Sequence, residues 1–203
     1  MSYKPAVVAL RRDRSKSLEN QLDRVMRPFL YHPDTESDGI HERHSRCDGW
    51  MVGGHWSGRY LSTAHGSADL VNPRRFPQDS PLAEYAACDG GPKHLLALER
   101  MRAVAEETAW RHWPAFIAER RRDHPLFGPV NDEPVSSIRS AFDEFVARDR
   151  DRAVTGTSLV TLEGQWLDGR GAMEESDAYY RRAGAYIDAL DEGVWLVCLS
   201  VHF

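Results

Sequence analysis

The last ten residues of the chain, 194–203, read VWLVCLSVHF and decide the fold. Apolar and β-branched residues follow one another here without helical spacing, which is typical of a buried strand. An exposed strand of this kind would pair with other chains and aggregate, so it must be paired inside a sheet. We therefore expect the C-terminal strand to lie in the centre of the sheet.

A second apolar run lies at the opposite end of the chain. Residues 4–10 read KPAVVAL and end at a charged cluster, which also predicts a buried strand. Residues 157–162, TSLVTL, predict another strand, followed by a turn into residues 165–167. Because strands occupy both ends and helices lie between them, we predict an α+β fold. Its small mixed or antiparallel sheet has the N- and C-terminal strands in the centre and is covered by helices.

Four segments between these strands carry apolar residues at helical spacing. The first begins after Ser17, a suitable N-cap, and is ended by Pro28. The longest covers about residues 92–122, where Pro114 predicts a kink or break and hence two joined helices. Further helices are predicted around residues 138–146 and 179–190.

The length of the chain bounds the number of domains. For 203 residues, 41% of them hydrophobic, we expect a single α+β domain spanning residues 1–203. Residues 32–47 and 62–91 are polar or proline-containing and show no sustained period, so we expect loop insertions near both. Residues 50–61, WMVGGHWSGRYL, predict a strand and turn, and a hairpin is one interpretation of their glycines.

Charge and composition exclude several classes of function. With 26 Lys and Arg against 31 Asp and Glu, the net charge is −5, which disfavours general binding of nucleic acid. No apolar run approaches the roughly 18 residues of a membrane-spanning helix, and the apolar stretch near the N-terminus is too short for us to expect a secretory signal. Three widely spaced cysteines form no disulfide framework. We expect a cytoplasmic protein that does not associate with membranes.

One segment has the spacing of a metal site. His41, His44 and Cys47 follow an H-x-x-H-x-x-C pattern, and their nitrogen and sulfur donors suit zinc. No second ligand pair follows at the spacing of a zinc finger. Solvent-exposed histidines of a loop are therefore the simpler interpretation, and zinc is a possible cofactor only.

The glycine-rich aromatic segment is the second candidate site. Glycines beside Trp56, with His55 and Arg59 close by, could form a floor on which a planar or anionic ligand stacks and pairs with a guanidinium. The alternative is a tight hairpin whose tryptophans fill the core. The candidate ligand-binding residues are Asp48, Trp50, Gly53, Gly54, Trp56 and Arg59.

Two histidines are candidates for general acid or base catalysis. His55 lies in the glycine-rich segment, and His202 lies in the C-terminal strand next to the last residue. A histidine in a strand is more often structural. Because the chain has no G-x-S-x-G elbow, phosphate loop, dinucleotide fingerprint or H-E-x-x-H motif, the sequence carries no warrant for nucleophilic hydrolysis.

The order of the motifs resembles an uncharacterised family of bacterial and bacteriophage proteins. The resemblance is carried by W-x-x-G-G-x-W-x-G at residues 50–58, D-x-G-x-x-x-x-L at 89–96, SLVTLEGQW at 158–166 and the terminal VHF. The family usually has arginine where this chain has His55, an aromatic residue where it has Cys47, and D-C-H where it has Ser200, Val201 and His202. The resemblance implies no particular activity.

These observations lead to two hypotheses about function. The first is a ligand- or partner-binding protein in a phage or host-interaction setting, which binds a small anionic or planar ligand or a partner protein. The second is a small enzyme with a His-centred site, for which zinc is the candidate cofactor. For either, we expect residues 50–59 to lie close to His202, so that Asp48, His55, Trp56, Arg59 and His202 share one concave region.

Overall fold

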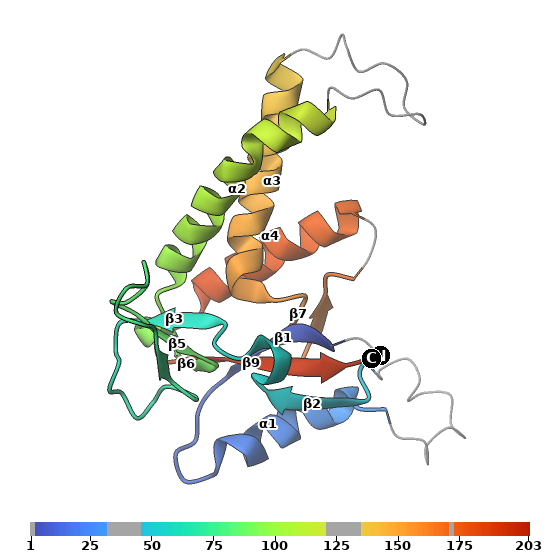
Figure 1. Cartoon of the computed structure of the whole chain (residues 1–203). Helices are drawn as coiled ribbons and strands as arrows, with labels where there is room; N and C mark the ends of the chain where they lie inside the picture. The colour runs from blue at the N-terminus through green and yellow to red at the C-terminus, as the bar shows by residue number, and fades with distance from the viewer. Residues whose placement is uncertain (1–2, 32–45, 121–134, 171–172) are drawn as a thin grey trace, which may run out of the picture.

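The computed structural model describes residues 3–31, 46–120, 135–170 and 173–203. Its main sheet has the strand order β2-β9-β1-β7-β8, and β6 also pairs with β9 (Figure 1). The bounds are β1 (Tyr3–Leu10), β2 (Gly49–Val52), β6 (Gly90–Pro92), β7 (Ser158–Val160), β8 (Trp166–Asp168) and β9 (Trp195–His202). Among the described helices, none is long and apolar enough to cross a membrane.

The two terminal strands form the centre of this sheet. β1 and β9 are antiparallel over eight residue pairs, from Tyr3 opposite His202 to Leu10 opposite Trp195. β1 pairs with β7 in parallel, whereas every other pair in the sheet is antiparallel. The predicted α+β fold, with a mixed sheet and both terminal strands central, is confirmed.

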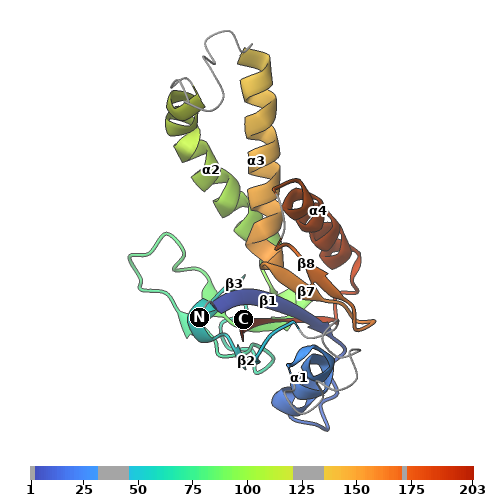
Figure 2. The same ribbon diagram turned by 90° about the vertical axis from the view of Figure 1, so that its right-hand side faces the viewer.

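Alternation along the central strands separates two cores. Val197, Leu199 and Val201 of β9 pack on one face with helix α1 (Leu18–Met26). Leu196 and Cys198 face the opposite side, where helix α4 (Met173–Ala189) packs. Figure 2 shows the layers, with α1 below the sheet and α4 above it. β9 is therefore apolar at nearly every position because both of its faces are covered.

Helix α1 follows its predicted signals. The side chain of Ser17 accepts a hydrogen bond from the backbone N–H of Asn20 at the helix N-terminus. Leu22 and Met26, one turn apart, are fully buried against the sheet. Pro28 lies in the short 3₁₀ helix η1 (Arg27–Phe29) that directly follows α1.

Helices α2 (Leu98–Arg120) and α3 (Val135–Thr155) pack side by side and extend away from the sheet (Figure 1). Their contact contains an aromatic cluster in which Trp110 and Trp113 lie 4.9 and 4.3 Å from Phe142, measured between ring centroids. Of the two predicted effects of Pro114, the break into two helices is wrong, since α2 continues through this residue, and the kink stays a prediction. Packing against α3 offsets the roughly 3 kcal/mol that an interior proline costs a helix.

Two strands of a second, three-stranded sheet lie within residues 62–91, the segment predicted as a loop insertion. This sheet has the order β3-β5-β4, with β3 (Tyr60–Ser62), β4 (Arg74–Arg75) and β5 (Ala86–Cys88). Strands of two or three residues are too short to show alternation, so the sequence could not reveal them. The hairpin interpretation of residues 50–61 is wrong, because β2 pairs with β9 and β3 pairs with β5. Most of the other predicted insertion, residues 32–45, lies outside the described residues.

Candidate functional site

The ends of β1, β2 and β9 bring a polar cluster together. The Nδ1 atom of His202 lies 3.3 Å from Oδ2 of Asp48. The ring of Tyr3 lies 5.1 Å from the ring of His202 and 4.4 Å from that of His55, measured between centroids. We call the group Tyr3, Asp48, His55, Ser200 and His202 the Tyr3 site.

The register of the sheet places these side chains. Tyr3 on β1 and Gly49 on β2 both lie opposite His202 on β9. Because side chains alternate along a strand, Ser200 and His202 lie on the same face as Cys198, which packs in the α4-side core. The Tyr3 site thus continues the α4 face of the sheet at the end where both chain termini lie, as Figure 2 shows.

Two glycines position the short 3₁₀ helix η3 (Gly54–Trp56), which carries His55. Gly53 and Gly54 have φ values of 65° and 54°, which lie in a backbone region that residues with a Cβ atom rarely adopt. A Cβ atom on Gly54 would lie only 2.7 Å from Cβ of Ser200. The glycine pair therefore lets the backbone of η3 approach β9 closely enough to bring His55 beside Tyr3.

Two polar atoms of the site are buried and unpaired. Nε2 of His202 and Oγ of Ser200 have no hydrogen-bond partner among the described residues, and both are inaccessible to solvent. The carboxylate of Asp48 contacts the other ring nitrogen and orients the imidazole. Tyr3, Asp48, Ser200 and His202 also line a small pocket of about 240 Å³.

A buried carboxylate that the sequence analysis missed holds the η3 segment. Asp89 is 1% exposed. Its Oδ1 accepts hydrogen bonds from Oγ of Ser57 at 2.8 Å and from the backbone N–H of Gly58 at 2.6 Å, and its Oδ2 accepts one from Nδ2 of Asn72 at 2.8 Å. The available signal was the D-x-G pattern beginning at this residue, an acid between a buried strand and two glycines.

Several predicted site residues lie elsewhere. Trp50 packs with the α1-side core, on the opposite face of the sheet from Ser200 and His202. Arg59 donates to the backbone oxygen of Arg152 at 2.6 Å, so it caps the end of α3 and does not point to the Tyr3 site. The structure thus brings Asp48 and His202 together, with His55 beside Tyr3. Trp50 also lines the small pocket of this site, whereas Arg59 does not.

Of the three predicted zinc ligands, only Cys47 lies within the described residues. His41 and His44 lie outside the described residues. Cys47 is buried, its Sγ atom lies 3.8 Å from the backbone oxygen of Phe29, and desolvation raises the pKa of its thiol to about 11. Within the described ranges, no group of three or more His, Cys, Asp or Glu residues is arranged to hold a metal ion.

The exposure of Trp56 leads to a test of the idea that the tryptophans of this segment fill the core. Its side chain is 39% exposed. We expect Trp56→Ala to lower the free energy of unfolding by at most about 1 kcal/mol, since little packing is lost. Phe142→Ala, which removes a fully buried ring, is the control and is expected to cost roughly 3–5 kcal/mol. Urea denaturation measures both, and equal losses would contradict this placement of Trp56.

No family model, no curated protein and no solved structure matches this chain. A function for this protein therefore follows from the chemistry of its own side chains.

Proposed function

We propose that the protein binds a small planar organic anion at the Tyr3 site. The observation that carries the proposal is the pair of unpartnered buried atoms, Nε2 of His202 and Oγ of Ser200, on neighbouring same-face positions of β9. The adjacent pocket of about 240 Å³ is smaller than the about 300–1,000 Å³ of sites for drug-sized ligands, so the ligand is small.

The chemistry of the two atoms favours an anionic acceptor. A buried polar group without a partner costs about 1–3 kcal/mol, which a ligand that pairs with it recovers. An imidazole N–H and a hydroxyl both donate to a carboxylate. Asp48 holds the ring by its Nδ1 side, so the Nε2 side is the one directed to a ligand.

The aromatic rings around the site favour a planar body for the ligand. Tyr3 is 38% exposed, and its ring contacts both that of His55 and that of His202. A flat ligand can make the same offset or tilted contacts with the exposed part of the Tyr3 ring, without a change of the backbone. Met51, which is 47% exposed and lines the same pocket, can change rotamer to admit the ligand to the buried atoms.

Benzoate is the probe that tests the proposal. We expect saturable 1:1 binding in calorimetric titration, and about tenfold weaker binding for His202→Gln, because a charge-assisted hydrogen bond is lost. Ser200→Ala is also expected to weaken binding without lowering the melting temperature, since it removes an unpaired buried hydroxyl.

The matched control is His94→Gln, the same substitution at an exposed histidine whose Nδ1 contacts the backbone oxygen of Glu192. It should leave benzoate binding unchanged. Benzoate binding that is absent from the wild type, or equal in the His202 and His94 variants, would overturn the proposal. In that case the capture of a protein by the same surface becomes the next hypothesis.

One observation favours the second candidate function, a small His-centred enzyme. The Asp48–His202 pair has the arrangement of a general base with an orienting carboxylate. However, Oγ of Ser200 makes no hydrogen bond to the imidazole, so a nucleophile–base pair is not assembled in the described residues. Zinc at His41, His44 and Cys47 belongs to this alternative, and elemental analysis of untagged protein tests it. On the resemblance to bacterial and phage proteins, we propose a phage or host-interaction setting for the binding function.

A further inference from the structure

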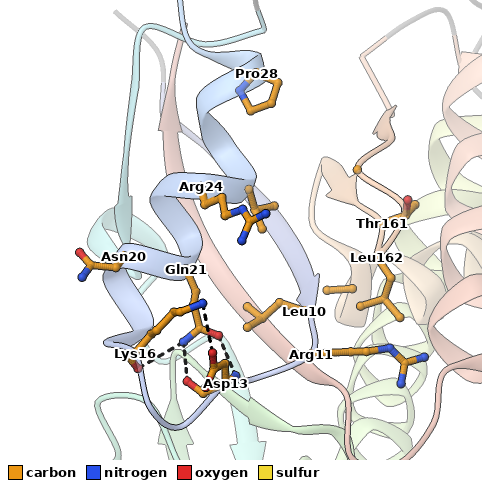
Figure 3. A pocket seen from close by; sticks show the side chains of 13 residues that line it. Leu10, Arg11, Asp13, Lys16, Asn20, Gln21, Arg24, Pro28, Thr161 and Leu162 are labelled. Carbon is orange, nitrogen blue, oxygen red and sulfur yellow. Dashed lines mark hydrogen bonds and ion pairs between the residues drawn. The ribbon is translucent and has the colours of Figure 1, made fainter.

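A larger groove lies far from the Tyr3 site, at the opposite end of β1. It is bounded by α1 on one side and by Leu10, at the end of β1, and Thr161 to Gly164, after β7, on the other (Figure 3). Its volume is about 740 Å³, within the range of about 300–1,000 Å³ for sites that bind small molecules. We call it the α1 groove.

The position of the groove in the sheet is one that ligands commonly occupy. β1 and β7 are the parallel pair of this sheet, and the groove lies at the carboxyl ends of both. Ligands of open α/β sheets bind in a crevice outside the carboxyl ends of the strands. The apolar part of its lining consists of Ala9, Leu10, Val25, Pro28 and Leu162.

The loop that borders the groove is strongly basic. Residues 11–16 read RRDRSK, four cations and one acid in a chain whose net charge is −5. Two of the cations are used within the structure. Arg12 donates to the backbone oxygen of Lys16 at 2.6 Å and lies over the ring of Trp195, and Arg14 pairs with Asp69 at 2.7 Å. Arg11 and Lys16 line the groove, where Arg24 of α1 joins them.

The single acid of this loop serves to shape it. Asp13 accepts hydrogen bonds from the backbone N–H and the hydroxyl of Ser15, and Lys16 lies 3.3 Å from it. These contacts lower the pKa of Asp13 to about 2. Gln21 of α1 also exchanges hydrogen bonds with the backbone of Asp13, so the loop is held against the helix before any ligand arrives.

Two guanidinium groups remain available to a ligand. Arg24 has no partner in the described part of the chain, and it extends from α1 toward Leu10 in Figure 3. Arg11 contacts Asp191 at 3.6 Å, but both side chains are more than 70% exposed, and such a pair is weak and screened by salt. Arg24 lines the groove from α1, and Arg11 lines it from the residue that follows β1.

We infer that the α1 groove binds an organic phosphate monoester with an apolar body. Two guanidiniums with Lys16 nearby match the double negative charge of a phosphate ester better than the single charge of a carboxylate. The apolar residues between them accept a hydrocarbon or aromatic group. This site is separate from the Tyr3 site and does not depend on the function proposed for it.

The probe is 1-naphthyl phosphate, and calorimetric titration measures its binding. We expect 1:1 binding that weakens with added salt and is about tenfold weaker in Arg24→Gln. Asn20→Glu adds a negative charge to the groove, and its carboxylate completes a capping box with Ser17, so it should weaken binding while α1 stays stable. Arg75→Gln, at an exposed arginine of β4, is the matched control and should bind as the wild type does.

Three outcomes would overturn the inference. The first is an affinity for 1-naphthol, which lacks the phosphate, equal to that for 1-naphthyl phosphate. The second is an equal affinity for inorganic phosphate, which lacks the apolar body. The third is an affinity for 1-naphthyl phosphate that neither Arg24→Gln nor Asn20→Glu changes. The same titration of His202→Gln separates the two sites. Binding that is lost in this variant and kept in Arg24→Gln would assign the phosphate ester to the Tyr3 site and refute the groove.

Discussion

Replacing Asp89 by alanine is expected to lower the free energy of unfolding by about 4 kcal/mol. The side chain is 1% exposed, and its carboxylate accepts three hydrogen bonds, from Ser57, Gly58 and Asn72. Alanine would leave all three donors without their partner, and hydrogen bonds to a charged group are among the strongest in proteins. Urea denaturation followed by circular dichroism measures the loss.

Two further variants make the test of Asp89 specific. Asp79→Ala removes an exposed carboxylate from the same region of the chain and should change stability by less than about 0.5 kcal/mol. Asp89→Asn keeps the shape of the side chain and one acceptor oxygen, so its loss of stability should lie between those of Asp89→Ala and Asp79→Ala. If Asp89→Ala were as stable as Asp79→Ala, the carboxylate would not hold the loop. We also expect Asp89→Ala to weaken benzoate binding, since the same loop carries His55.

The second large effect is expected at the next residue. A Cβ atom on Gly90 would lie 2.2 Å from the backbone oxygen of Leu196 and 2.8 Å from Cα of Val197, and its φ is 154°. Both neighbours are backbone atoms of the central strand β9, so neither can move without disturbing the sheet. We expect Gly90→Ala to cost roughly 3–5 kcal/mol through overpacking and backbone strain.

The control for this variant is Gly49→Ala on β2. A Cβ there would meet nothing within 4 Å, so its stability should stay within about 0.5 kcal/mol of wild type. If Gly90→Ala does not fold, Gly91→Ala keeps the prediction testable. Its Cβ would lie 3.1 Å from the nearest atoms, and it should show a smaller loss in the same urea titration. A Gly90 variant as stable as the Gly49 variant would contradict the close approach of β6 to β9.

The candidate site was predictable where it depends on strands. His202 lies at the end of a strand with an unambiguous pattern, and the pairing of both terminal strands brings Tyr3 beside it. Asp48 and His55 were expected near His202, and both are found there. Arg59 was not predictable, because its place at the end of α3 depends on a contact 93 residues away in the sequence. Asp89 was overlooked because an acid followed by two glycines is also an ordinary turn signal.

The sequence by itself determined the elements and the fold class. The runs at residues 4–10 and 194–203 have to be buried strands, and Ser17 has to cap a helix, because hydrophobic burial and local hydrogen bonding act over a few residues. Only the tertiary structure decided which polar side chains meet. It continued α2 through Pro114 and assembled the α1 groove from a loop, a helix and the end of β7. Those outcomes depend on contacts between distant segments, and a local sequence pattern does not determine the energies of such contacts.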